Sequence, residues 1–266
     1  MIYRLLIVVF SFAGSHIAIY YVASLIDDTL VDVYKIDSIA TICTLILWSV
    51  FAVRCIKIYS FDEALFTNKV PNNIVNYIIF FIFILFAFPS AYEVFEGTSP
   101  KRLIVYFFFM LATGFAEELI FRGLALPACS SKWGVKIGLL VSSLLFSAIH
   151  IFKAINPEVS LGEAVGNCIT ALVLGFLLGA MYLRSGNILV PIAFHFLYNL
   201  LLGYNGLKDP DIKAEGIQAS GDLASTVVTI IIFSLLTAYS YRLIKLEGVE
   251  RIESRFNINR TPQQNI

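Results

Sequence analysis

The chain has 266 residues, of which 58% are hydrophobic and only 14% are charged, and its mean hydropathy is +0.81. Soluble domains usually carry about 25% charged residues. The composition therefore excludes an ordinary water-soluble globule and predicts an all-α protein embedded in a lipid bilayer. Nineteen basic residues balance nineteen acidic ones, which leaves no basic field to hold nucleic acid. Four dispersed cysteines without C-x-x-C spacing argue against a disulfide framework or a structural zinc knot.

Apolar stretches recur along the chain, and each was compared with the roughly 20 residues that cross ~30 Å of hydrocarbon. The comparison predicts eight spans, of which the second and fifth are short. They run from Leu5 to Leu25, Ser38 to Val53, Val70 to Tyr92, Leu103 to about Pro127, Ile137 to Phe152, Ala164 to Leu183, Asn187 to Gly206 and Leu223 to Tyr241. We expect one transmembrane helical domain over residues 1–245 and a polar C-terminal tail over residues 246–266.

Basic residues next to the spans predict the orientation of the chain, because Lys and Arg are retained in the cytoplasm. With the N-terminus inside, the inner segments carry twelve Lys and Arg residues and the outer segments carry six. Both termini are therefore predicted to be cytoplasmic.

The fourth span contains three ionisable residues within six positions, Glu117, Glu118 and Arg122. Each costs at least ~2.5 to 3.5 kcal/mol to place at the centre of a bilayer, so each needs a partner or a water-filled cavity. Glu118 and Arg122 are four residues apart and share a helix face, which predicts an ion pair. That pair alone is equally consistent with a structural lock between helices. Glu117 is rotated by about 100° and lacks this partner, and such a carboxylate indicates function.

Two of the three histidines lie in later spans, His150 in the fifth and His195 in the seventh. Phe146 precedes His150 by four residues, and Asn199 follows His195 by four, so each pair shares a helix face. A lone histidine in an apolar helix is usually a packing residue. However, a rise of 1.5 Å per residue puts Glu117, His150 and His195 in one layer, reached from the cytoplasmic side. This convergence predicts a common site.

Other residues predict packing alone. His16 in the first span has no polar companion, which favours a packing or interfacial role. Gly175 and Gly179 form a G-x-x-x-G pattern that lets two membrane helices approach closely. No chemistry is assigned to either feature.

Together, three segments resemble the CAAX protease and bacteriocin-processing family of intramembrane endopeptidases, which includes type II CAAX prenyl endopeptidases and Abi-type proteins. The resemblance lies in E-E-x-x-x-R from Glu117, F-x-x-x-H ending at His150, and H-x-x-x-N from His195. It covers about Leu103 to Gly206, the expected catalytic core. The resemblance implies an integral, multi-pass protein of a bacterial plasma membrane, with the lipid bilayer as its surroundings.

The resemblance also implies roles for the residues at the motif positions. Glu117 and His150 would hold and activate the attacking water, while His195 and Asn199 would stabilise the oxyanion. The supporting residues would be Glu118, Arg122 and Phe146. A carboxylate in a poorly solvated cavity is well suited to general-base catalysis, and fixed donors suit a developing negative charge.

Metal dependence stays open at this stage. Glu117, His150 and His195 also have the composition of a His₂Glu zinc site with an open position for water. Against this, the sequence lacks H-E-x-x-H, so the ligands would come from three separate helices. We therefore favour a mechanism without a metal, with zinc as the alternative.

The leading hypothesis is an endopeptidase that cleaves a membrane-associated protein or peptide, of CAAX type or with a leader. One alternative is a transporter or proton relay, since intramembrane carboxylates and histidines also line ion pathways, although no internal repeat is visible. Another is a non-catalytic bacteriocin-immunity protein that keeps the polar core for stability. The sequence does not select the substrate, a partner protein or an oligomeric state.

Overall fold

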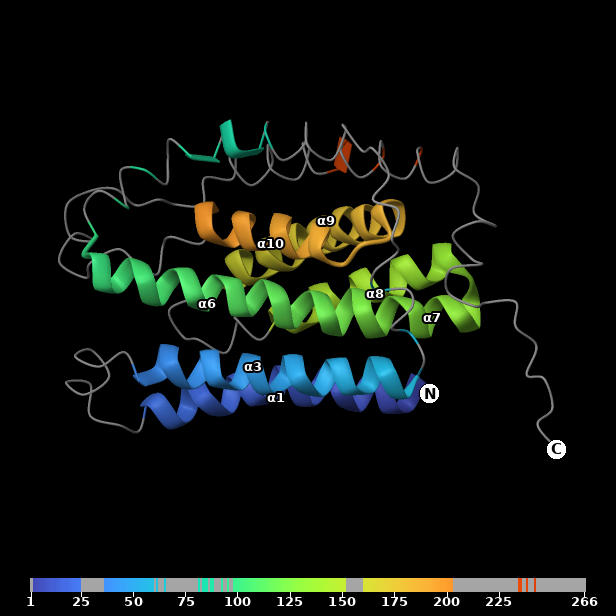
Figure 1. Ribbon diagram of the computed structural model, residues 1–266, viewed down its shortest axis with the longest axis horizontal. Coiled ribbons are helices and arrows are strands. Elements are labelled where there is room, and N and C mark those ends of the chain that lie inside the picture. The colour runs from blue at the N-terminus through green and yellow to red at the C-terminus, as the bar shows by residue number, and fades with distance from the viewer. Residues whose placement is uncertain are drawn as a thin grey trace.

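The computed structural model describes residues 2–24, 36–59, 98–151 and 160–202, with isolated positions between 61 and 95 and between 234 and 242. Within these residues the chain is helical and forms no β-strand, which confirms the all-α prediction for this part of the chain. The elements are α1 (Ile2–Ser24), α3 (Ile36–Ile58), α6 (Pro100–Glu118), η1 (Leu119–Ala125), α7 (Leu126–Trp133), α8 (Val135–Ile149), α9 (Leu161–Ser185) and α10 (Leu189–Leu202) (Figure 1).

Three described helical stretches are long and apolar enough to cross a membrane, namely Thr41–Ile58, Pro100–Trp133 and Ala164–Ser185. Shorter apolar helices are Ile2–Ser15, Val135–Ile149 and Leu189–Leu202. The length and composition of these helices are those of a membrane protein. The third and eighth predicted spans lie mostly outside the described residues, so the count of eight and the orientation stay predictions.

Two helices differ in their ends from the predicted spans. The second span was expected to end at Val53, but α3 continues to Ile58. Its last turns carry Arg54 and Lys57, whose long apolar stems allow a helix to continue past the first charge. The fifth was expected to run from Ile137 to Phe152, but α8 begins directly after Gly134 and its α-helical part ends at Ile149.

The helix of the fourth predicted span also continues past Pro127, where the span was expected to end. Here the α-helix widens into the π-helix η1 over Leu119–Ala125 and then continues as α7 to Trp133. A proline inside a regular α-helix lacks an N–H group and clashes with the carbonyl four residues earlier. The wider turns just before Pro127 change this spacing, so the helix passes through the proline without ending.

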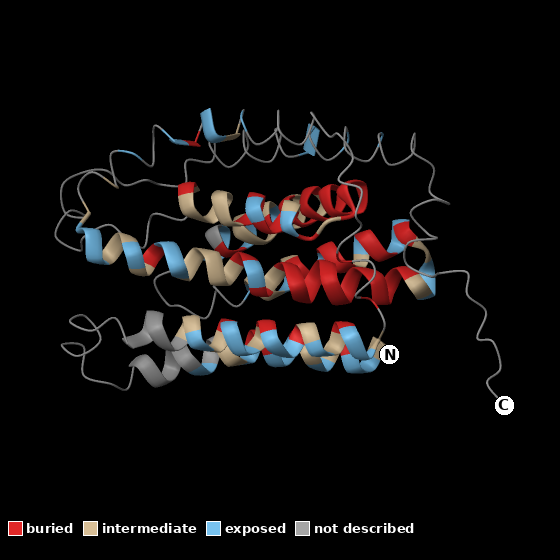
Figure 2. Cartoon of the chain, in the orientation of Figure 1, coloured by how far each residue is buried: buried red, intermediate tan, exposed pale blue. Residues whose placement is uncertain are grey.

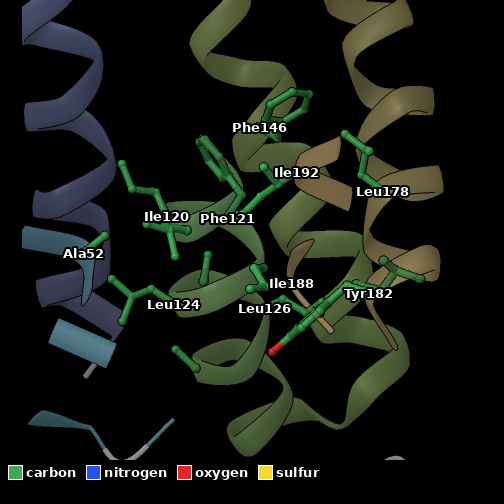
Figure 3. Close-up of a cluster of buried hydrophobic side chains, with 14 of the residues drawn as sticks. Ala52, Ile120, Phe121, Leu124, Leu126, Phe146, Leu178, Tyr182, Ile188 and Ile192 are labelled. Atoms are coloured by element: carbon green, nitrogen blue, oxygen red, sulfur yellow. The ribbon is translucent and has the colours of Figure 1, made fainter. Parts of the chain in front are cut away.

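The η1 segment lies at the centre of the packed helices. All seven of its residues are buried, and it contacts α1, α3 and α8. In Figure 3, Ile120 and Leu124 face Ala52 of α3, whereas Phe121 lies on the side of Phe146. The hydroxyl of Ser142 on α8 donates a hydrogen bond of 2.7 Å to the carbonyl of Phe121. This bond satisfies a main-chain acceptor within the widened turn.

The helices pack so that η1 lies between the pair α1 and α3 and the helix α8. Helices α1 and α3 lie side by side, and α6 packs against α3 on one side and α10 on the other. Helix α8 contacts α7 and α9, and α9 contacts α10. Figure 2 shows buried residues concentrated in η1, α7 and the last part of α9, while α1 and α3 carry many exposed ones. The core that positions the polar residues is therefore built by α6 to α10.

Two glycines with positive φ reverse the chain between consecutive helices. Gly134 has φ 81° between α7 and α8, and Gly186 has φ 61° between α9 and α10. This region of backbone conformation strongly favours glycine. After the second turn, the Asn187 side chain accepts a hydrogen bond of 2.9 Å from the N–H of Leu189, which caps the start of α10. This cap fixes the helix that carries His195.

Candidate active site

An ion pair buried between helices lies at the junction of α6 and η1. Glu118 and Arg122 are both fully buried, and Nη1 of Arg122 donates to Oε1 of Glu118 at 2.9 Å. This is the pair that the spacing of four residues predicts. Because a buried charge is tolerated only with a partner and hydrogen bonds, the two residues must be considered as one unit.

Arg122 extends this unit to two further helices. Its Nη2 donates to the main-chain carbonyl of Gly175 on α9 at 3.0 Å. Its guanidinium carbon lies 4.6 Å from the ring centre of Phe146 on α8, a cation–π distance. The guanidinium therefore joins η1, α8 and α9.

The sequence predicted only a packing role for Gly175. It did not predict that the main-chain carbonyl of Gly175 accepts a hydrogen bond from Arg122. Packing is present, because a β-carbon at Gly175 would lie 3.2 Å from both Cδ1 of Phe146 and Cα of Ser143. The same close approach lets the guanidinium reach the carbonyl oxygen. A main-chain acceptor leaves no sequence signal apart from the glycine itself.

His195 of α10 contacts both glutamates. Its ring is almost fully buried, with Nδ1 2.8 Å from Oε1 of Glu118 and Nε2 3.6 Å from Oε2 of Glu117. The Glu117 side chain keeps 12% of its surface exposed, whereas that of Glu118 keeps none. The structure thus brings the polar residues of the fourth and seventh predicted spans together, with Glu117 at the more accessible side.

Phe146 and His150 connect α8 to this group. The buried ring of Phe146 lies 5.0 Å from the His150 ring and 5.6 Å from the His195 ring, measured between ring centres. Nδ1 of His150 is 2.9 Å from the carbonyl oxygen of Phe146. A carbonyl only accepts, so Nδ1 of His150 is the donor and carries a proton. His150 is therefore part of the cluster, linked to His195 by ring contacts with Phe146.

Asn199 contacts α6 through its main chain. Its main-chain carbonyl accepts a hydrogen bond of 2.8 Å from the hydroxyl of Tyr106, which also lies 3.1 Å from the carbonyl of Leu200. This bond ties α10 to α6. Among the described contacts, the Asn199 amide has no bond to the other predicted site residues. The side chain of His16, expected to pack in the first span, lies outside the described residues.

The donor set of the described residues does not form a metal site. A catalytic zinc ion usually takes three protein ligands. Glu117 and His195 approach each other, but no group of three His, Cys, Asp or Glu side chains in the described part of the chain is arranged to hold a metal ion.

Comparison with known proteins identifies the segment that carries the site. Residues 99–201 match the family described as type II CAAX prenyl endopeptidase Rce1-like. The uncharacterized protein YpbD of Bacillus subtilis (strain 168) is 35% identical over 98 residues, which cover 36% of this chain and 43% of that protein. The match therefore spans less than half of this relative, and no solved structure gives a significant match. Over residues 99–201, which include Glu117, His150 and His195, the chain is therefore similar to the type II CAAX prenyl endopeptidase Rce1-like family.

Proposed function

We propose that this protein is an intramembrane endopeptidase that hydrolyses a peptide bond of a membrane-associated protein or peptide. In this proposal it crosses a bacterial plasma membrane several times and opens its site towards the cytoplasm. The observation that carries the proposal is the approach of Glu117 to His195 beside a fully buried carboxylate and guanidinium. Hydrolysis at such a site needs no serine or cysteine nucleophile.

The chemistry follows from the distance between Glu117 and His195. At 3.6 Å, Oε2 of Glu117 and Nε2 of His195 are too far apart for a good direct hydrogen bond. Polar atoms at this separation are suitably placed to share a water molecule. Glu117 acts as the general base towards that water, with His150 on the α8 side. Side-chain donors of His195 and Asn199 stabilise the negative charge on the substrate carbonyl oxygen.

The proposed substrates are chains tethered to the membrane, with either a CAAX-type end or a leader peptide. Both present a peptide bond next to an apolar anchor, which suits a site enclosed by apolar helices. The mechanism is proposed to work without a metal, because among the residues that the structure describes no third ligand joins Glu117 and His195.

The test uses purified protein in proteoliposomes with two substrates, a prenylated CAAX peptide and a membrane-anchored peptide with a leader. Wild type should cleave at least one of them, and Glu117→Gln should lower the rate by about 10² to 10⁴, the usual contribution of a general base. Folded protein and helix content should stay unchanged. Cleavage by Glu117→Gln at the wild-type rate contradicts the proposal.

Two further arms separate the alternatives. Exhaustive chelation should leave cleavage intact, whereas loss of cleavage that zinc restores would establish the zinc mechanism. A pH-sensitive dye inside the vesicles reports proton flux. Flux that depends on Glu117, without cleavage of either substrate, would favour the proton relay over proteolysis.

A further inference from the structure

One carboxylate oxygen in the site accepts two hydrogen bonds, and this fixes the position of a proton. Oε1 of Glu118 lies 2.9 Å from Nη1 of Arg122 and 2.8 Å from Nδ1 of His195. A guanidinium is always charged, and a carboxylate that it binds is ionised and only accepts. The proton of this second hydrogen bond therefore belongs to Nδ1 of His195.

A neutral imidazole carries only one N–H group, so Nε2 of His195 must then carry a lone pair. That lone pair lies on the side of Oε2 of Glu117, at 3.6 Å. A neutral His195 held in this way cannot donate from Nε2 to an oxyanion. The role that the family resemblance implies for His195 therefore requires a second proton on its ring.

We propose that His195 is a proton acceptor at Nε2, and that Glu118 and Arg122 are positioning residues that set this tautomer. The catalytic part of this inference rests on the proposed function. As the water attacks, one of its O–H bonds breaks, its proton moves to Oε2 of Glu117 and from there to Nε2 of His195, and its oxygen forms the bond to the carbonyl carbon. The π electrons of the carbonyl move to its oxygen. The imidazolium then donates its new Nε2–H to this oxyanion and finally gives the proton to the leaving nitrogen as the C–N bond breaks.

The charges around His195 suit this sequence of steps. Glu117 and Glu118 of α6 both contact the ring, and the positive charge of Arg122 on η1 is directed to Glu118. From α8, His150 is linked to His195 by ring contacts with Phe146, and α9 contributes the carbonyl of Gly175 to Arg122. The two carboxylates stabilise an imidazolium that forms during the reaction.

The test is the ring ¹⁵N NMR spectrum of the protein labelled with [¹⁵N]histidine. The chain has only three histidines, and single His→Gln substitutions assign their signals. At the alkaline end of a titration, where the ring is neutral, His195 should carry its proton on Nδ1. A neutral ring with the proton on Nε2 would overturn the proposal, and this measurement on wild type needs no variant to fold.

Glu118→Gln tests the positioning role, with His150 as the internal control. A glutamine amide offers either an oxygen or an NH₂ group, so the share of the Nδ1–H tautomer of His195 should fall. The tautomer of His150 should not change, because its Nδ1 donates to the carbonyl of Phe146. An unchanged His195 tautomer in this variant would refute the role of Glu118. The spectrum does not depend on turnover, so a failure to cleave any substrate would count against the proposed function alone.

Discussion

Helices α1 and α3 differ from helices α6 to α10 in what they bury, although both groups are apolar in sequence. Both groups turn large apolar side chains outward, and the first group has them together with an apolar interior; its exposed examples are Tyr3, Ile7, Phe10, Leu47, Val50 and Phe51. Its described cross-helix hydrogen bond joins Nε1 of Trp48 to Oγ of Ser15 at 2.9 Å. The second group encloses a carboxylate, a guanidinium and an imidazole. In a membrane, the first arrangement suits contact with lipid and the second suits chemistry.

The difference arises from how closely the helices approach one another. On α9, glycine at position 175 lets the chain pass close to Phe146 and Ser143 of α8. The hydroxyl of Ser147 on α8 also reaches the carbonyl of Cys168 on α9, at 2.7 Å. Small residues at such contacts are the usual means of tight packing between membrane helices. Close packing therefore excludes lipid from the ion pair and supplies its main-chain acceptor.

Removal of the buried cation should have the largest effect on stability. Arg122→Met leaves Glu118 buried without its cationic partner, and we expect a loss of about 3 to 5 kcal/mol in the free energy of unfolding. Unfolding by SDS titration or steric trapping measures it. Arg54→Met in α3 is the matched control, because Arg54 is exposed, and it should change stability by less than about 0.5 kcal/mol. If Arg122→Met and Arg54→Met lower the stability equally, the proposed difference between the two groups of helices is contradicted.

A methyl group added at the close contact between α8 and α9 should lower the stability by a smaller amount. Gly175→Ala places a β-carbon 3.2 Å from Phe146 and Ser143, and overpacking of this kind costs about 1 to 3 kcal/mol. Gly166→Ala on the same helix is the control, because a β-carbon there meets nothing within 4 Å. The control should be neutral or gain up to about 1 kcal/mol from helix propensity. A Gly175→Ala variant as stable as Gly166→Ala would contradict the close contact.

The smallest effect is expected in α1 and α3. Ser15→Ala removes the acceptor of the Trp48 indole and should cost about 1 kcal/mol, the net value of one hydrogen bond. Peptide cleavage should continue at the wild-type rate, because this bond lies outside the proposed site. A large loss of cleavage with unchanged stability would show that α1 and α3 take part in the chemistry.

Local spacing predicted much of the site, because helix geometry relates positions within one element. Four residues between Glu118 and Arg122 were enough to predict their ion pair, and helix depth correctly related Glu117 to His195. The π-helix could not be predicted, since Ser142 contacts it from another helix. The hydrogen bond from Arg122 to the carbonyl of Gly175 could not be predicted either. Every residue has a main-chain carbonyl, and only the tertiary fold selects this one as the acceptor.

The central claim is that side chains from α6 and α10 act as one catalytic unit, and a double-mutant experiment on cleavage tests it most directly. Rates are compared for Glu117→Gln, His195→Ala and the double variant in proteoliposomes. Residues that act as a unit are strongly non-additive. We predict that each single substitution lowers the rate by about 10² to 10⁴ and that the double variant is no slower than the slower single variant. If the two losses multiply instead, Glu117 and His195 act independently and the account is contradicted.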